Sequence, residues 1–453
     1  MKRTIHYFIL TLAIGAPCLT ARANDLKEPR PLWRTVAKFE SERPVSVDTL
    51  AADADGNLYA AISTSDNEGR IHAVVRRSSD HGITWSVVED FVPGASGHAR
   101  ILSLGSDAAG HLYAAGYVSD EQDQLRWIVR KRVVGGTAWS TVDDFTLPGS
   151  QKTAAQSLSV NADGTVYVAG YGDEPPGSGS WHTRTHWLVR CSRDGGQTWS
   201  TVEDFSHEFS ARATAILSTP QGVFVGGSGW NEGEATGESW LVRKGTLDET
   251  GALRWRTVDA FQMEDGQHGH VSRVQSLGMD RHGNLYAAGR SHAWVEERSS
   301  AHWVVRRASR AGLDWVVVDT FQYNPGYFAA AQGVAAGSDG GVFIVGQAGH
   351  SDGGINWIVR QSSTGMGGTW KLSDDFRMEA VTFSTDQFAE ESQGHASQTV
   401  MSNSPGEYSK GLAILMAAET LYTGGSVWAG SGHAVLRKCE LGQAGELKSA
   451  SRR

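Results

Sequence analysis

Tryptophan recurs at a near-constant interval along the chain, and this period constrains the fold more than any other feature. The spacings between successive members of the series are 52, 54, 60, 56, 60 and 55 residues. The members are Trp33, Trp85, Trp139, Trp199, Trp255, Trp315 and Trp370. A period of this size indicates a repeat architecture, in which one supersecondary unit is copied along the chain.

Each period contains four short β-like segments separated by turn sequences. In the third period, "AAQSLSV" and "TVYVAGY" flank "NADG", and "HWLVRCS" and "TWSTVEDF" flank "RDGGQ". The segments are rich in Val, Trp, Tyr and Thr, and the turns are rich in Asp, Asn and Gly, as in β-hairpins. We therefore predict an all-β fold, a seven-bladed β-propeller of four-stranded antiparallel blades.

The predicted blade boundaries follow from the same repeat. Six full blades span residues 46–91, 99–145, 154–205, 211–261, 271–321 and 330–376, and an incomplete last blade spans 411–440. The lone segment 32–40 supplies the missing strand, so the seventh blade is closed by the N-terminal strand pairing with the C-terminal strands. Such closure removes exposed sheet edges. Residues 377–410 are predicted to be an inserted loop and residues 441–453 a polar tail.

The first 23 residues have the pattern of a secretory signal peptide. A basic start precedes the apolar run "FILTLAIGA", and "ARA" at residues 21–23 is a small-residue cleavage site. Cleavage near Ala23 changes the formal net charge from −9 to −12, because it removes Lys2, Arg3 and Arg22 and no acid. We expect an exported monomer, periplasmic or extracellular, without a transmembrane segment. An acidic chain without a basic block is also a poor binder of nucleic acid.

Two turns between third and fourth segments share the pattern Ser-x-Asp-x-Gly-x-Thr-Trp. The copies are "SSDHGITW" and "SRDGGQTW". Their defining residues are Ser78, Asp80, Gly82 and Trp85, and Ser192, Asp194, Gly196 and Trp199. The pattern resembles the Asp box, or bacterial neuraminidase repeat, and the chain from about residue 32 to 440 resembles a sialidase-superfamily propeller. The resemblance implies that these residues build turns on the face opposite the family's active sites.

A pair of charged positions is copied almost as regularly as the tryptophans. An arginine follows the third-segment aromatic site by three residues, at Arg76, Arg130, Arg190, Arg243, Arg306, Arg360 and Arg437. An acid follows the fourth-segment tryptophan by four residues, at Glu89, Asp143, Glu203, Asp259, Asp319 and Asp374. We predict that these opposite charges pair between neighbouring strands and have a structural role.

Three other arginines do not belong to the repeat. Arg100, Arg212 and Arg273 occupy one position near the start of the first segment, with a one-residue gap in the fourth blade. If they face the central channel, their guanidinium groups can converge on one carboxylate. This arrangement is similar to the arginine cluster with which sialidases hold the substrate carboxylate. The alternative is that each arginine neutralises a local acid, such as Glu208 or Glu264.

Four tryptophans also fall outside the repeat, in the predicted loops between second and third segments. They are Trp181, Trp230, Trp294 and Trp428. Exposed aromatic rings suit sugar faces or cations. These tryptophans and the three arginines therefore form the predicted ligand site, on the propeller face that carries these loops (the loop face). The alternative is that each ring anchors its own loop.

These observations favour a non-catalytic recognition propeller that binds an acidic glycan or a similar anionic ligand. Two alternatives remain: a glycoside hydrolase, exo-sialidase-like with divergent catalytic motifs, and an envelope scaffold that binds protein. No catalytic residue is assigned, because the family's Arg-Ile-Pro motif is represented only by "ERPV" at residues 42–45, without the Ile. We expect no cofactor and no metal, since the histidines lack a strong ligand spacing.

Overall fold

The all-β prediction is confirmed for the part of the chain that the computed structural model describes. It describes residues 32–441, except 95–96, 176–182, 208–209, 232–236, 264–269, 296–297, 378–407 and 429–431. This part contains 28 strands and no helix, so no helix long and apolar enough to cross a membrane occurs in it. The predicted signal peptide, almost all of the predicted 377–410 loop and almost all of the predicted tail lie outside these residues.

Successive strands fall into groups that follow the sequence repeat. The first group comprises β2 (Ser46–Ala52), β3 (Leu58–Ser65), β4 (Ile71–Ser78) and β5 (Ser86–Phe91). The second comprises β6 (His98–Ser106), β7 (Leu112–Ser119), β8 (Leu125–Arg132) and β9 (Trp139–Phe145). The third comprises β10 (Lys152–Val160), β11 (Val166–Glu174), β12 (Arg184–Ser192) and β13 (Ser200–Phe205). The fourth comprises β14 (Ala211–Thr219), β15 (Gly222–Asn231), β16 (Gly237–Leu247) and β17 (Leu253–Phe261).

The remaining groups continue the same order. The fifth comprises β18 (His270–Met279), β19 (Leu285–Val295), β20 (Arg298–Ala308) and β21 (Val316–Phe321). The sixth comprises β22 (Ala329–Ala336), β23 (Val342–Gly349), β24 (Ile355–Ser362) and β25 (Lys371–Phe376). The last comprises β26 (Tyr408–Ala417), β27 (Thr420–Trp428) and β28 (Gly432–Glu440). The first strand of the chain, β1 (Arg34–Ser41), pairs antiparallel with β28 and so adds a fourth strand to this group.

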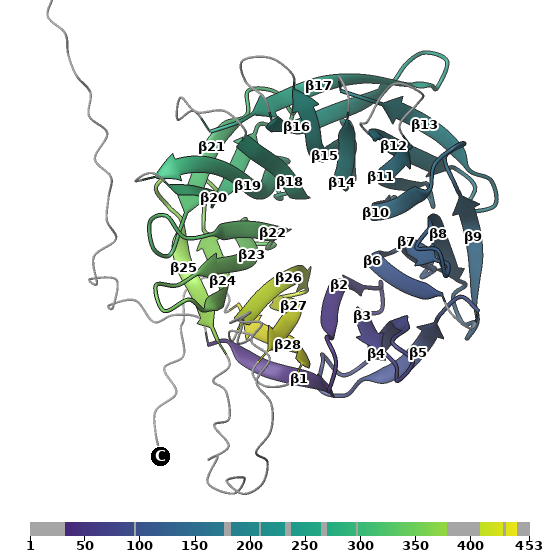
Figure 1. The fold of residues 1–453 in the computed structure, drawn as a ribbon, viewed down its shortest axis with the longest axis horizontal. Helices are drawn as coiled ribbons and strands as arrows, with labels where there is room; N and C mark the ends of the chain where they lie inside the picture. Colours follow the sequence, from purple (N-terminus) through teal and green to yellow (C-terminus); the bar gives the residue numbers. More distant parts are fainter. Residues whose placement is uncertain are drawn as a thin grey trace, which may run out of the picture. The chain divides into compact units, whose positions relative to one another are not determined.

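The strands of a group pair antiparallel in sequence order, and all described strands lie in one compact unit. Figure 1 shows the groups around a common centre, with the first strand of each group nearest to that centre. Short parallel contacts between β8 and β10, β16 and β18, and β24 and β26 link neighbouring groups. The first strands therefore meet near the centre, where residues from different groups can share one site.

The core is made of layers between neighbouring groups. Tryptophans of the third strands are fully buried: Trp127, Trp187, Trp240, Trp303 and Trp357. Trp303 of β20 packs with Ala329 and Ala331 of β22, so its ring fills the interface with the next group. The same ring meets Phe321 edge-on at a centroid distance of 6.1 Å. Aromatic contacts of this kind add to the free energy of burial.

The repeated charges pair between groups, which corrects the predicted pairing between neighbouring strands of one sheet. Arg190 of the third group binds Asp143 of the second, with a 2.7 Å Nε–Oδ2 distance. The other pairs are Arg130–Glu89, Arg243–Glu203, Arg306–Asp259, Arg360–Asp319 and Arg437–Asp374. In each sheet the register sets the acid opposite a valine of the third strand, for example Asp143 opposite Val129. The acid is therefore available to the arginine of the following group.

Each of these arginines also lies over the phenylalanine that ends the preceding group. The distance from the guanidinium carbon to the ring centroid is 4.0 Å for Arg190 over Phe145 and 4.0 Å for Arg437 over Phe376. Arg76 of the first group lies 4.7 Å from the ring of Phe39, which belongs to β1. The same contact therefore recurs between the first group and the sheet that contains both ends of the described chain.

The two Ser-x-Asp-x-Gly-x-Thr-Trp segments build turns. In the first, Asp80 accepts hydrogen bonds from Ser78 Oγ at 2.7 Å and from the backbone N of Thr84 at 2.8 Å, and Ser78 Oγ accepts from Gly82 N. Gly82 has a φ of 86°, which favours glycine. Asp194 makes the same contacts, and its hydrogen bonds with Thr198 lower its pKa to about 2. The carboxylates are thus occupied by the turns themselves.

One intergroup acid gives a pH-dependent stability. Burial raises the pKa of Glu203 from 4.5 to about 7, although Arg243 at 2.7 Å opposes the shift. The Glu203 carboxyl group therefore holds its proton more tightly in the folded chain than in the unfolded chain. The protonated Glu203 side chain contributes its full stabilisation of the fold below about pH 4.5, and this contribution is lost as the pH rises through about 7. By this shift, the free energy of unfolding decreases by about 3 kcal/mol across that range.

Urea unfolding of the wild type and of Glu203→Gln at several pH values measures this contribution. The Gln variant is expected to lose the corresponding part of the pH dependence between about pH 5 and 7.5. Exposed Glu249→Gln serves as the control and should keep it. Identical pH profiles for the wild type and Glu203→Gln would contradict the assignment.

Candidate functional site

A small pocket lies where strands of the third, fourth and fifth groups meet. Its volume is about 190 Å³. It is lined by Thr185, Ser210, Arg212, Ser228, Gly229, Trp230, Glu238 and Arg273. Two of the three predicted arginines and one of the four predicted tryptophans therefore meet in one pocket. A pocket of this size is smaller than those that enclose drug-sized ligands and suits a single ring or charged group.

The sheet register explains how the arginines reach equivalent places. Arg212 of β14 pairs with Ser228, and Arg273 of β18 pairs with Arg290. Arg100 of β6 pairs with Tyr117, and in all three strands a register shift begins one residue after the arginine. The three arginines thus hold one structural position in three groups. This position lies near the start of the innermost strand, close to the shared centre of Figure 1.

Each arginine of the set interacts with an acid of the preceding group. Arg273 Nη2 lies 2.6 Å from Glu238 Oε2, and Arg212 Nη2 lies 3.6 Å from Asp173 Oδ1. The guanidinium of Arg212 also lies 3.8 Å from the ring centroid of Tyr171. The longer contact leaves Arg212 less strongly paired, and its side chain is 35% exposed. Arg212 is therefore the more available cation for a ligand.

Arg100 does not line this pocket. Its Nη2 lies 3.2 Å from Asp48 Oδ1, and its Nε donates to Ser63 Oγ at 3.1 Å. The three arginines therefore do not line one common pocket, and Arg100 has the local acid partner of the alternative interpretation. The acids proposed for that alternative, Glu208 and Glu264, lie outside the described residues.

Arg290 is a neighbouring cation that sequence reasoning missed. It stands opposite Arg273 in the β18–β19 register, and its buried Nε has no hydrogen-bond partner in the described structure. Burial and the charge of Arg273 lower the pKa of Arg290. Arg273 Nε is likewise buried without a partner. Alignment of the second strands would have drawn attention to Arg290, because Tyr117, Tyr171 and Ser228 hold the equivalent register position.

The predicted tryptophans are placed differently from expectation. Trp230 is 40% exposed and is the last residue but one of β15, where its backbone N donates to Ser210 O at 2.7 Å. Trp294 lies in β19 opposite Ser299, and Trp428 ends β27 opposite Gly432. These three belong to strand ends and not to loops, because the second and third strands extend further than predicted. Trp181 lies outside the described residues.

The lining of the pocket favours binding of an anion over acid–base chemistry. Glu238 is the carboxylate among the lining residues, and Arg273 occupies it. Burial raises the pKa of nearby Tyr171, which disfavours the phenolate form that a nucleophile needs. Within the described ranges, no three side chains of His, Cys, Asp or Glu gather into a group that could hold a metal ion.

Comparison with known proteins bears on the fold. No protein-family model and no curated protein matches this sequence. The polysaccharide lyase Uly1 is similar in structure, with 11% identity, coverage of 89% of this chain and 91% of the lyase, and a TM-score of 0.51. At this identity the likeness supports a β-propeller fold and nothing more.

Two further solved structures superpose less closely. The GH93 α-L-arabinofuranosidase of Fusarium graminearum in complex with arabinobiose has 11% identity, coverage of 90% and 98%, and a TM-score of 0.46. YCF48 bound to D1 peptide has 13% identity, coverage of 92% and 98%, and a TM-score of 0.45. Superpositions this loose carry no information about the ligand or activity of this chain.

Proposed function

We propose that this chain is an exported recognition propeller that binds an acidic glycan, or a similar anionic ligand, in the pocket of Arg212 and Arg273. The observation that carries the proposal is the shared lining of one pocket by two guanidinium groups and an exposed indole, that of Trp230. Guanidinium groups bind carboxylates, and a flat ring packs on a sugar face. The remaining polar lining comes from the Glu238 carboxylate and the hydroxyl groups of Thr185, Ser210 and Ser228.

The proposed architecture is a closed ring of seven blades. Pairing of β1 with β28 completes the last four-stranded sheet, with Phe39 opposite Ala434. Stacking of Arg76 on Phe39 supports closure, because it joins this sheet to the first group by the contact that joins the other groups. A closed ring holds the strands of different groups rigidly, which suits a site built from three of them.

Binding is favoured over glycoside hydrolysis by the number of carboxylates in the pocket. Most retaining glycoside hydrolases use two carboxyl groups about 5 Å apart, and sialidases use a tyrosine in place of the nucleophilic carboxylate. The described lining contains one carboxylate, that of Glu238, which lies 2.6 Å from Arg273, and it contains no tyrosine. Glu238 instead competes with an anionic ligand for Arg273, so it is expected to limit the affinity and to favour ligands that also reach Arg212.

In the test, the full chain is titrated with uronic-acid oligosaccharides and with neutral oligosaccharides of the same length. Calorimetry measures the affinity in each titration. Arg212→Ala and Arg273→Ala are each expected to weaken binding roughly 10- to 100-fold, as expected when hydrogen bonds to charged groups are lost. Glu238→Gln should strengthen binding, because it removes the competing charge and keeps the shape. Arg100→Ala is the matched control, since Arg100 holds the same register position outside the pocket.

Far-ultraviolet circular dichroism and thermal unfolding of each variant show whether it is folded. The proposal fails if neutral oligosaccharides bind as tightly as the acidic ones. It also fails if folded Arg212→Ala and Arg273→Ala bind as the wild type does, or if Arg100→Ala loses as much affinity as they do.

A further inference from the structure

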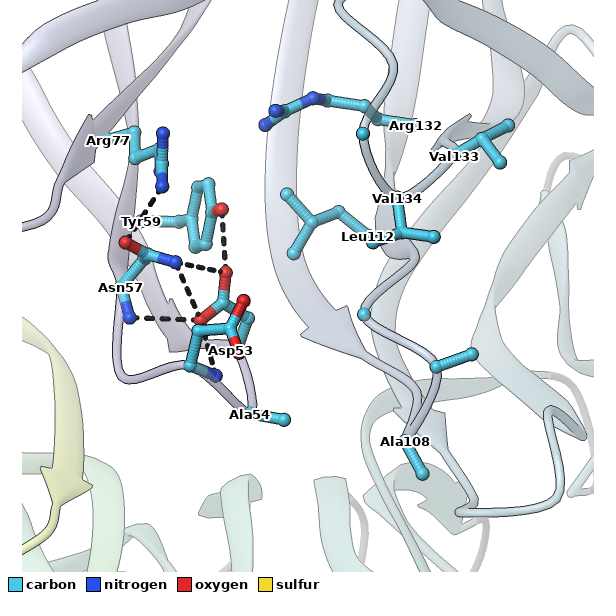
Figure 2. Close-up of a pocket in the computed structure, with 14 residues that line it drawn as sticks. Asp53, Ala54, Asn57, Tyr59, Arg77, Ala108, Leu112, Arg132, Val133 and Val134 are labelled. Atoms are coloured by element: carbon cyan, nitrogen blue, oxygen red, sulfur yellow. Dashed lines mark hydrogen bonds between the residues drawn. The ribbon is translucent and has the colours of Figure 1, made fainter.

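A second and larger pocket lies at the opposite ends of the strands, between the first and second groups. Its volume is about 480 Å³. One wall is the turn between β2 and β3 with Tyr59 and Arg77, and the other is the turn after β8, which begins at Arg132 (Figure 2). The two pockets share no lining residue, so this pocket is separate from the proposed ligand site.

In three other interfaces, a backbone carbonyl of the protein occupies the corresponding position. Between the second and third groups, Gly195 O accepts hydrogen bonds from Lys131 Nζ at 2.7 Å and from Tyr113 Oη at 3.3 Å. Between the fourth and fifth groups, Ala311 O accepts from Lys244 Nζ at 2.9 Å. His81 O has the same role toward Tyr422 and Lys438. A backbone carbonyl from the turn after the third strand thus covers the cation of the preceding group.

The interface between the first and second groups lacks this carbonyl contact. The turn after β8 has Arg132 and Val134 where the two complete copies of the repeated motif have Ser and Asp. Arg77 instead donates from Nη2 to Asn57 Oδ1 at 2.8 Å, and Tyr59 Oη donates to Asp53 Oδ2 at 2.9 Å. The protein therefore leaves open the place that a carbonyl oxygen occupies in those three interfaces.

Two guanidinium groups of this pocket have unused donors. Arg77 Nε and Arg132 Nη1 are buried and have no hydrogen-bond partner in the described structure. Figure 2 shows both side chains directed toward the same end of the pocket, where the Tyr59 hydroxyl lies. Burial and the bond to Asp53 raise the pKa of Tyr59, while the charges of Arg77 and Arg132 both act against that increase. Both cations therefore act on the same small region.

The carboxylate of Asp53 faces the two guanidinium groups of this region, and its charge also acts on Tyr59. Asp53 accepts hydrogen bonds from Asn57 N, from Asn57 Nδ2 and from Tyr59 Oη, so its oxygens are occupied. Asp55 lies at the exposed turn, where water screens its charge. The opposite wall is apolar: Leu112 lines it, and Val133 and Val134 are 52% and 55% exposed at its edge. The pocket combines buried cationic donors with an exposed apolar wall.

We propose that this pocket is a second binding site, which takes an organic carboxylate with an apolar body. The carboxylate oxygens accept hydrogen bonds from Arg77 and Arg132 and take the place of the missing turn carbonyl. The apolar body packs against Leu112 and Val134. The volume of the pocket lies within the range of small-molecule sites. A small aliphatic acid and the C-terminal residue of a peptide offer the same chemistry, and the test separates these two sources.

The test titrates the full chain with hexanoate and with an acetylated tetrapeptide that ends in leucine, as its free acid and as its amide. Binding is followed by chemical-shift changes of the backbone amides of residues 53–57 and 132–135. At least one free acid is expected to bind, and the amide at least tenfold more weakly. Arg77→Gln and Arg132→Gln should each lower the affinity at least tenfold. Arg281→Gln is the control, because Arg281 is an exposed arginine on the turn of another group.

Val134→Trp is a second variant, which fills the pocket from an exposed position and therefore leaves the fold intact. It should abolish binding without loss of thermal stability. Binding of hexanoate alone identifies a small-acid site, and binding of the peptide acid alone identifies a chain-end site. The proposal is overturned if neither acid binds, if the amide binds equally well, or if the arginine and Val134 variants bind as Arg281→Gln does.

Discussion

Replacement of Arg306 by methionine is expected to lower the free energy of unfolding by about 3–5 kcal/mol, the penalty for leaving one partner of a buried ion pair alone. Arg306 and Asp259 form two contacts of 2.8 Å, and their side chains are 10% and 5% exposed. Arg306 also donates to Trp315 O at 2.9 Å and lies over Phe261. The variant leaves the Asp259 carboxylate buried without its cation. Urea unfolding at pH 7 measures the loss.

A double variant separates this penalty from the net contribution of the pair. Replacing both partners, as Arg306→Met with Asp259→Leu, removes the stranded charge and is expected to recover most of the lost stability. The two residues belong to different groups, so recovery also shows that the contact joins the groups. A double variant that is less stable than Arg306→Met alone would contradict this account.

The second large effect is expected from Gly227→Ala. A Cβ atom at this position would lie 2.0 Å from the carbonyl oxygen of Arg212 and 2.7 Å from the ring of Trp187. Backbone and a buried indole cannot move aside easily, so β14 and β15 must separate. Overpacking of this kind costs typically 1–3 kcal/mol. Because Arg212 itself is displaced, we also expect weaker binding of acidic oligosaccharides.

Gly367→Ala is the matched control, because the nearest atom to its added Cβ lies 3.9 Å away. Chemical denaturation and calorimetry of both variants measure the two effects. If Gly227→Ala unfolds and binds as Gly367→Ala does, the close approach of β14 and β15 is not needed to position Arg212.

The sequence alone predicted the β-strands and their grouping, because both depend on local patterns. Alternation of apolar and polar residues and the Asp- and Gly-rich turns mark each strand where it occurs, as between "AAQSLSV" and "TVYVAGY". It also predicted that Arg306 and Asp259 belong to a repeated structural set. It did not predict the partner, because pairing within one sheet and pairing across two groups leave the same spacing in the sequence.

The candidate sites could not be predicted from the sequence, because they depend on which strands, far apart in the sequence, lie close together in the fold. Arg212, Glu238 and Arg273 meet because β14, β15, β16 and β18 follow one another across one sheet, and Arg290 joins them through the β18–β19 register. The pocket beside Arg77 is open where one turn does not supply a carbonyl that three of its counterparts supply. Local patterns specify strands and turns, whereas a site requires knowledge of which side chains neighbouring sheets bring together. The sequence therefore determined the repeat and its strands, and only the tertiary structure decided which arginines share a pocket.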